Sequence, residues 1–249
     1  MKRQGFSLLE LLLASAILVV LGALVTRALV DQADLTRRTQ ARSEVQDRVR
    51  MVMELVKQDL MMAGSSRYVS FSASSANSFL AGVTESIAGW TACSSTNPCL
   101  SADAGNSTSL RDSFSVRYIT SLRATSDACR RVVYSFNSYT LQRSDVSCSA
   151  TADSPQPLAD NILVLNVRFE CSDGSSADAG SPPCTNNRYA RAAHITVVGF
   201  SLAQAPGNPP EAMAFSVQSG NSTLTENCPS GRICFGTSER VELPSLKDQ

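Results

Sequence analysis

A glutamate stands inside the most apolar stretch of the chain. Glu10 lies in the segment 6–25, whose only other polar residues are Ser7 and Ser15. A carboxylate within a membrane-length apolar helix costs about 2.5–3.5 kcal/mol on insertion scales, so such a group indicates a functional site by default. Because opposite charges attract strongly where the dielectric constant is low, we expect Glu10 to pair with a cation. The chemistry of this residue is therefore ion pairing rather than catalysis.

A short basic leader that ends in glycine precedes this stretch. Lys2, Arg3 and Gly5 come before Phe6, and Glu10 follows in the apolar run. This arrangement resembles the type III signal of type IV pilins and type II secretion pseudopilins. The resemblance implies that a prepilin peptidase cleaves between Gly5 and Phe6 and methylates the new N-terminus at Phe6. It also implies that Glu10 faces the positive N-terminus of a neighbouring subunit, or its own, and sets subunit register.

Two other kinds of N-terminal segment share some of these features. An ordinary secretory signal also has a basic start and an apolar core, but that core lacks a carboxylate and ends in a small-x-small site. Ala14-Ser15-Ala16 is such a site, although it lies too early in the apolar run. An uncleaved signal anchor needs neither Glu10 nor the Gly5-Phe6 pair. The coincidence of these features favours the pilin-type signal.

The sequence pattern predicts that Glu10 lies on one long helix. At about 1.5 Å per residue, the segment 6–25 spans the thickness of a bilayer core, about 30 Å. The next apolar residues recur at spacings of four and three, which predicts an amphipathic continuation: Val45, Val49, Val52, Val56 and Leu60. We expect a helix over 6–63, about 85 Å long, that ends at Gly64. The alternative is two helices broken near Gly22 or Asp31.

Composition and charge suit one globular domain with an anchor. The chain has 249 residues, 43% hydrophobic content and a formal net charge of +0. We divide it into a leader (1–5), a transmembrane or filament-core helix half (6–30), an amphipathic helix half (31–64) and a β-rich globular domain (65–249). A net charge near zero gives no support for nucleic acid as the main partner. The residues that would form a basic surface for DNA are Arg130, Arg131, Arg188 and Arg191.

The globular part reads as antiparallel strands after a loop-rich start. Residues 65–106 are rich in Ser, Ala, Gly and Asn and predict mostly loop. The strands that follow are expected at 114–118, 132–136, 139–143, 162–169, 195–202, 213–217 and 240–243, with 162–169 and 195–202 central and Asn137-Ser138 as a hairpin turn. A long N-terminal helix packed on an antiparallel sheet domain with disulfide-rich loops is an α+β fold, the pilin fold in the family resembled above.

The cysteines indicate an oxidising compartment. All eight lie beyond the helix, and their number is even. Proximity in sequence favours pairs of neighbours, although many connectivities are open: Cys93 with Cys99, Cys129 with Cys148, Cys171 with Cys184, and Cys228 with Cys234. A zinc site is the rival interpretation, but the spacings and the single histidine fit zinc poorly.

Other chemistry-bearing residues are sparse. The single histidine, His194, stands in an apolar strand pattern, and a lone strand histidine is more often structural than catalytic. No nucleophile elbow, paired metal ligands or phosphate loop occurs in the sequence. Asp173, Gly174 and Asp178 share one loop, but their spacing does not match an EF-hand, which favours a solvated loop over a calcium site. We therefore expect no enzyme activity, no cofactor and no metal.

Motifs along the body narrow the resemblance to PilW-type minor pilins, with J-type pseudopilins of type II secretion as the alternative. The resembling segments, in order, are MELVKQDLMMAG (53–64), DSFSVRY (112–118), YSFNSYTLQRS (134–144), LADNILVLNVRFECSDG (158–174) and residues 190–202. The end of the chain, TSERVELP (237–244), departs from the Arg-rich end common in these proteins, which leaves the partner of the last strand open.

The resemblance implies a structural role. A PilW-type protein assembles with other minor pilins and the major pilin, primes filament growth and sits at the pilus tip, in some cases supporting a large adhesin. The expected processes are pilus assembly, cell adhesion and twitching motility. The leader would lie in the cytoplasm and the helix in the inner membrane. The globular domain would be periplasmic before assembly and at the cell surface afterwards.

Overall fold

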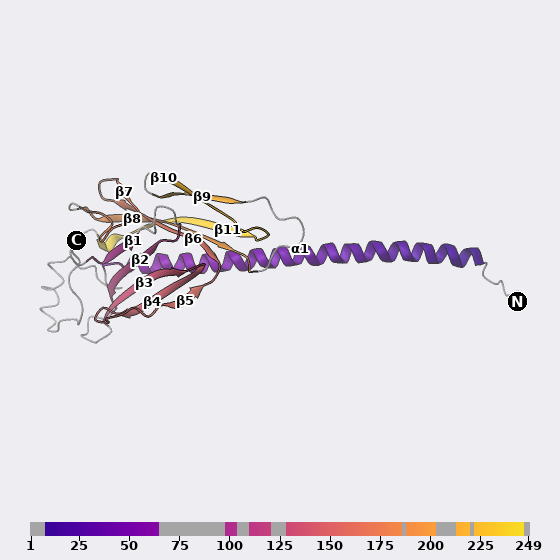
Figure 1. Ribbon diagram of the computed structural model, residues 1–249, viewed down its shortest axis with the longest axis horizontal. Coiled ribbons are helices and arrows are strands. Elements are labelled where there is room, and N and C mark those ends of the chain that lie inside the picture. The colour runs from indigo at the N-terminus through magenta and orange to yellow at the C-terminus, as the bar shows by residue number, and fades with distance from the viewer. Residues whose placement is uncertain are drawn as a thin grey trace.

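One long helix and a β-rich body make up the molecule (Figure 1). The computed structural model describes residues 8–64, 98–103, 110–120, 128–185, 188–202, 213–219 and 222–246. Helix α1 (Leu8–Met62) projects far beyond the body at its N-terminal end, and its C-terminal half lies within the body (Figure 1). The α+β arrangement expected from the sequence is confirmed.

Helix α1 is continuous from Leu8 to Met62, so the alternative of a break near Gly22 or Asp31 is wrong. The residues of the predicted stripe are all fully buried: Val45, Val49, Val52, Val56 and Leu60. The helix ends where Ala63 N donates to Leu60 O, and Gly64 adopts a left-handed φ of 73°. Glycine adopts that conformation without a Cβ penalty, which explains the predicted end at Gly64.

The first sheet lies on one side of α1 and has five antiparallel strands in sequence order. These are β1 (Leu100–Asp103), β2 (Ser113–Ile119), β3 (Cys129–Asn137), β4 (Thr140–Ser147) and β5 (Gln156–Ala159). The strands expected at 114–118, 132–136 and 139–143 fall in β2, β3 and β4, except that Tyr139 lies in the turn before β4. The segment expected to be loop, 65–106, contains β1, while residues 65–97 lie outside the described residues.

The turn of the β3–β4 hairpin corrects the sequence prediction by one residue. Asn137 pairs with Thr140 in the ladder, so the two turn residues are Ser138 and Tyr139 rather than Asn137 and Ser138. Ser138 takes the positive φ, 56°, that a tight hairpin turn requires. The register follows from burial: Val132, Tyr134 and Leu141 must all point into the core, and these contacts override the local preference of asparagine for the turn.

The second sheet has four antiparallel strands in the order β11-β8-β6-β7. They are β6 (Ile162–Cys171), β7 (Ser176–Ala177), β8 (Ala190–Phe200) and β11 (Cys234–Glu242), and β11 leads into the 3-10 helix η1 (Pro244–Leu246). The prediction that β6 and β8 are central is confirmed, and the last strand pairs with β8. A separate hairpin of β9 (Ala214–Ser219) and β10 (Ser222–Asn227) packs over the sheet. Short or polar strands β1, β5, β7 and β10 were not predicted.

The main core lies between α1 and the two sheets. Its helix side is the Val45–Leu60 stripe, and its sheet side includes Tyr134, Leu165 and Phe169. Gly199 of β8 allows the closest approach, because a Cβ there would lie 2.9 Å from Val49 Cγ2. A smaller cluster, which includes Leu163, Val198 and Phe200, is covered by apolar residues of the β9–β10 hairpin.

Three disulfides join cysteines that are neighbours in sequence. They are Cys129–Cys148, Cys171–Cys184 and Cys228–Cys234, each the pair expected from proximity. Cys99 is also disulfide-bonded, whereas Cys93, its expected partner, lies outside the described residues. A disulfide typically stabilises by about 2–4 kcal/mol, mainly by restricting the unfolded chain, and these three fasten a hairpin and two loops.

Candidate assembly interface

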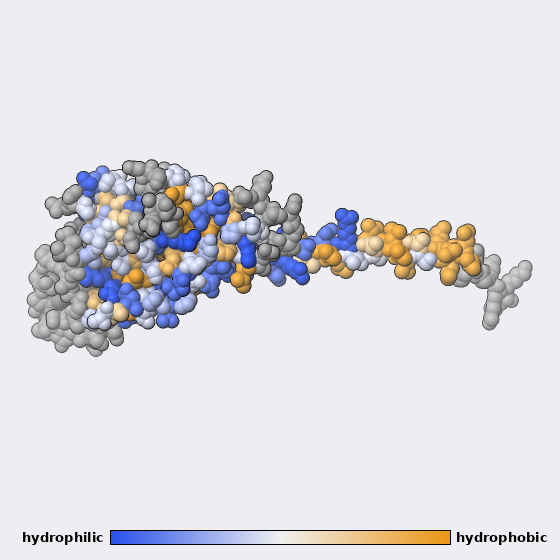
Figure 2. All heavy atoms as spheres, viewed as in Figure 1, coloured by the Kyte–Doolittle hydropathy of each residue, from blue (hydrophilic) through white to orange (hydrophobic). Residues whose placement is uncertain are grey.

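The N-terminal half of α1 is an apolar surface that none of the described residues covers. Among the described residues, α1 is the one helix long and apolar enough to cross a membrane, and its most apolar stretch has no buried part. Leu8, Leu11, Leu18 and Leu24 are each 60% or more exposed. Figure 2 shows this stretch as a continuous hydrophobic rod that ends where charged residues begin, before the helix enters the body. A surface of this size and apolarity indicates a membrane or a partner helix as its environment.

The predicted processing and assembly residues lie at or beyond the start of this rod. Gly5 and Phe6 are outside the described residues, and so is the side chain of Glu10. The backbone of Glu10 lies in the first turn of α1, so the position belongs to the helix and lies among the exposed leucines. Cleavage between Gly5 and Phe6, methylation of Phe6 and ion pairing by Glu10 stay predictions.

A buried polar cluster, which sequence reasoning missed, fixes the other half of α1 to the first sheet. Asp59 is 1% exposed and lies within the apolar stripe. Tyr134 Oη donates to its Oδ2 at 2.5 Å, and Arg143 donates from Nε to Oδ2 at 2.9 Å and from Nη2 to Oδ1 at 3.2 Å. The signal in the sequence was an acidic residue adjacent to Leu60 on the buried face, since a buried charge is almost always paired.

Electrostatics within this cluster keep Tyr134 neutral. Burial raises the pKa of Tyr134 well above its usual value, and the charge and hydrogen bond of Asp59 add to that rise. Burial also raises the pKa of the nearby Tyr118 to about 12, with Asp145 and Asp59 contributing. The Asp59 carboxylate therefore has two fixed donors, one phenolic and one guanidinium, and α1 has a defined rotation about its axis.

Two further contacts tie α1 to the second sheet. Arg48 pairs with Glu44 one turn earlier at 2.5 Å and donates from Nη1 to the backbone oxygen of Phe200 at 3.2 Å. Lys57 Nζ lies 3.0 Å from Glu239 Oε2 on β11. Since these contacts and the Asp59 cluster lie on opposite sheets, the body holds the helix from both sides. The exposed rod is consequently presented in one fixed direction.

The arginines considered for DNA contact are all paired with carboxylates. Arg130 lies 2.7 Å from Asp145, Arg131 lies 2.9 Å from Asp153, and Arg188 lies 3.1 Å from Asp173; Arg191 pairs with Glu170. The four positions lie on two sheets and on the approach to β8. Each of these charges therefore has an opposite charge beside it.

In the loop of Asp173, Gly174 and Asp178, both carboxylates interact with other side chains of the protein. Asp173 accepts from the backbone and hydroxyl of Ser175, and Asp178 lies 3.9 Å from Arg168. The side chain of Asp178 is 10% exposed, so the expectation of a fully solvated loop is wrong at this residue. In the described part of the chain, no group of three or more His, Cys, Asp or Glu residues could hold a metal ion. His194 is 52% exposed on β8 and faces Glu170.

Known proteins match both the N-terminal leader and nearly the whole length of the chain. The family described as the prokaryotic N-terminal methylation motif matches residues 1–26, a range that includes Gly5, Phe6 and Glu10. The chain is 40% identical to the pilin-like protein PilA3 of Thermus thermophilus over 253 aligned positions, which cover 98% of this chain and 97% of that protein. The chain belongs to the type IV pilin superfamily.

A solved structure of a type IV-like pilin from Thermus thermophilus is also similar to this pilin-like protein. The match covers 81% of this chain and 97% of the other, with a TM-score of 0.49 and 13% sequence identity. The superfamily assignment itself rests on the relative that spans nearly the whole chain. This assignment confirms the resemblance to the type IV pilin superfamily that the basic leader and the apolar helix indicated.

Proposed function

We propose that this pilin-like protein is a minor pilin that primes assembly of a type IV pilus and occupies its tip. The observation that carries the proposal is the uncovered apolar half of α1, directly behind a leader that matches the N-terminal methylation motif. Such a helix is stable in a bilayer, and in a filament it is stable only when other apolar helices surround it. The protein therefore functions by helix packing.

Processing and ion pairing give the helix its register. Cleavage between Gly5 and Phe6 would leave a methylated, positively charged amine at Phe6. Glu10 of one subunit would then pair with this amine on a neighbour, because both charges lie where the dielectric constant is low. Loss of one partner of a buried ion pair typically costs about 3–5 kcal/mol, which is enough to decide whether a subunit docks.

The partners and location follow from the same geometry. The peptidase and the inner membrane act on the N-terminal rod before assembly, while the disulfide-bonded body lies in the oxidising periplasm. Other minor pilins and the major pilin would pack against the rod during assembly. At the tip, the body is free to contact the surroundings, including a large adhesin. The PilW-type segments within the two sheets support this choice over a pseudopilin of type II secretion.

Paired variants test the proposal in cells that carry the native gene replaced by the variant. Gly5→Ala should leave an uncleaved precursor of higher mass, and Glu10→Ala should be cleaved and methylated normally yet give few or no pili. Glu10→Asp is the matched control, because it keeps the charge and should restore part of the piliation. Intact-mass spectrometry and pilus counts by electron microscopy are the measurements.

Full piliation in Glu10→Ala would contradict the ion-pairing role. A mature protein that begins at Met1, or after Ala16, would contradict pilin processing altogether. Loss of protein secretion together with normal pili would indicate that the protein belongs to a type II secretion system and not to a pilus. These outcomes separate the minor pilin from the pseudopilin and from an ordinary membrane anchor.

A further inference from the structure

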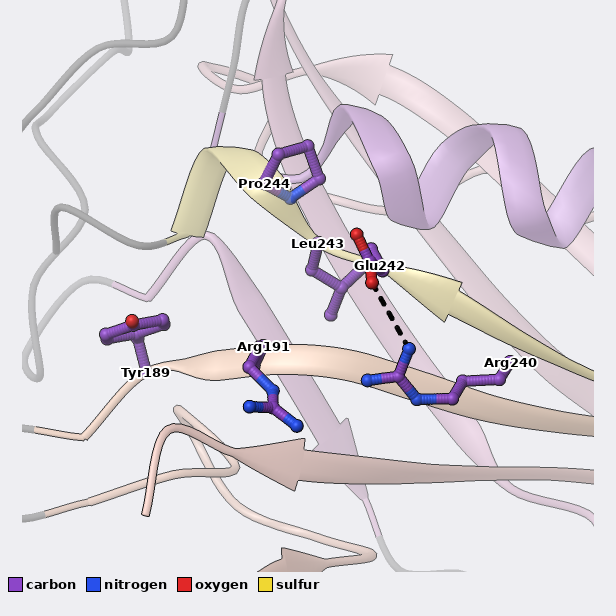
Figure 3. A pocket seen from close by; sticks show the side chains of 6 residues that line it. All are labelled: Tyr189, Arg191, Arg240, Glu242, Leu243 and Pro244. Carbon is purple, nitrogen blue, oxygen red and sulfur yellow. Dashed lines mark hydrogen bonds and ion pairs between the residues drawn. The ribbon is translucent and has the colours of Figure 1, made fainter. Parts of the chain in front are cut away.

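A surface pocket lies at the end of the body that is remote from the apolar rod. It has a volume of about 460 Å³ and is lined by Tyr189, Arg191, Arg240, Glu242, Leu243 and Pro244. The lining comes from the start of β8, the end of β11 and η1, as Figure 3 shows. In Figure 1 this end of the molecule, marked by the C-terminus, lies opposite the N-terminus of α1. Nothing in the assembly role described above uses this pocket.

The two arginines of the pocket are held by one carboxylate. Glu170 of β6 is 19% exposed and accepts from Arg240 Nε at 3.1 Å and from Arg191 Nη2. The hydrogen bond from Arg240 lowers the pKa of Glu170, with Arg191 contributing, so this carboxylate stays ionised. Both guanidinium groups are therefore fixed in place before any ligand arrives. Fixed guanidinium groups are the preferred protein partners of carboxylates, since their N–H groups match the two oxygens.

The sheet register places two further nitrogen-bearing side chains beside Arg240 and Glu170. Arg168 of β6 lies opposite His194 of β8, and His194 lies opposite Arg240 of β11. Arg168 has Asp178 at 3.9 Å, and His194 Nε2 lies 3.7 Å from Glu170. At the pocket itself, two guanidinium groups share the half-buried carboxylate of Glu170. A second anion is needed to balance them.

Glu242 supplies that anion within the chain, but weakly. Its side chain is 79% exposed, and its one ion pair among the described residues is with Arg240 Nη1 at 3.3 Å. Exposed pairs of this kind contribute only about 0–1 kcal/mol, so Glu242 can be displaced at small cost. Arg191, which is 54% exposed, has Glu170 as its one ion-pair partner in the described part of the chain. The pocket thus contains a carboxylate that a better-placed one can replace.

We propose that this pocket binds a carboxylate borne by an acidic peptide side chain, and that Glu242 occupies the position of that carboxylate when the pocket is free. Arg191 and Arg240 bind the carboxylate. The ring of Tyr189 and the exposed ring of Pro244 contact the hydrocarbon part of the ligand. The same charge chemistry would accept a free small carboxylic acid, which has no such apolar part. The proposal does not depend on pilus assembly, because it concerns the isolated chain.

The test is a titration of the full-length protein in mild detergent with acetyl-aspartate N-methylamide, followed by ligand-observed NMR. The blocked asparagine and acetate are the comparison probes. We expect the blocked aspartate to bind and the blocked asparagine not to bind. Arg191→Gln should weaken binding about tenfold, since it removes a charge-assisted hydrogen bond to the ligand carboxylate. Arg188→Gln is the matched control, because Arg188 is exposed and ion-paired away from the pocket.

The decisive variant is Glu242→Gln, which should tighten binding of the blocked aspartate by about two- to fivefold, because the internal competitor is weakened. Glu239→Gln, on the same strand but paired with Lys57, should leave it unchanged. An increase in affinity cannot result from misfolding. Equal binding of aspartate and asparagine, or unchanged or weaker binding in Glu242→Gln, overturns the proposal. Acetate binding as tightly as the blocked aspartate overturns the peptide source in favour of a small carboxylic acid.

Discussion

The two halves of α1 show how one helix can serve two environments. The N-terminal half is apolar on every side and is exposed throughout its described side chains, whereas the C-terminal half has one apolar stripe that is fully buried. A polar and mostly exposed segment, 31–44, separates them, and Val45 is the first buried residue of the helix. An all-round apolar helix needs a membrane or other helices around it, while a striped helix needs one packed face. The spacing of apolar residues along the helix therefore distinguishes the exposed apolar half from the half that packs into the core.

Polar residues also differ between the halves. In the C-terminal half, Asp59 is buried with two donors supplied by the same chain. In the N-terminal half, Glu10 is the one acidic residue of the apolar run, and the proposed cation comes from another subunit. Both positions place a carboxylate in a medium of low dielectric constant, where the cost of an unpaired charge is high. One ion pair would fix the helix within its body, and the other would fix it within the assembly.

The largest expected effect on stability comes from removing the internal pair. Asp59→Ala leaves Arg143 and Tyr134 without their shared acceptor, and breaking a buried pair typically costs about 3–5 kcal/mol. Urea unfolding of the full chain in mild detergent, followed by circular dichroism, gives the free energy of unfolding. Glu54→Ala, an exposed acidic residue on the same helix, is the control and should change it by less than about 0.5 kcal/mol. Equal effects of the two variants would show that the buried Asp59 cluster does not stabilise the packing of α1 on the first sheet.

Leucine truncations compare the two halves directly. Leu60→Ala removes a fully buried side chain and should lower the free energy of unfolding by about 2–5 kcal/mol. Leu18→Ala, in a side chain that is 72% exposed, should leave body stability unchanged and reduce incorporation into pili. The same unfolding assay and pilus counts provide the readouts. If Leu18→Ala destabilised the body as much as Leu60→Ala, the division between assembly half and core half would be wrong.

The smallest effect is a dependence of stability on alkaline pH, which arises from two tyrosines of the first sheet, the sheet that packs on the C-terminal half of α1. The pKa of Tyr118 is raised from 10.0 to about 12 by burial, and that of Tyr134 is raised in the same direction. Because the unfolded chain releases these protons first, stability is fully present below about pH 10 and falls as the pH rises through 10 towards 12. Urea midpoints across this range measure the fall. Tyr118→Phe should make it shallower, and an identical slope in that variant would remove the tyrosine explanation.

Local patterns were sufficient for the elements that depend on neighbours in sequence. The stripe from Val45 to Leu60 gave the buried face of α1, and Gly64 gave its end, because both depend on helical geometry. The two inner strands of the second sheet were visible as apolar runs. The hairpin turn was displaced by one residue because packing of Tyr134 and Leu141, not turn preference, set the register.

By itself, the sequence determined the long helix and the strand-rich body, which follow from hydrophobic periodicity. The pilin-type start was recognised by the resemblance of its leader to a known family. Proximity along the chain favoured the three disulfide pairs that the structure shows, among many possible connectivities. Only the tertiary structure decided which donors surround Asp59, since Tyr134 and Arg143 are 75 and 84 residues away from it. It also brought Glu170 between Arg191 and Arg240 from three different strands. Such clusters arise from strand order and from the loss of water around buried charges, and no short pattern along the chain encodes either.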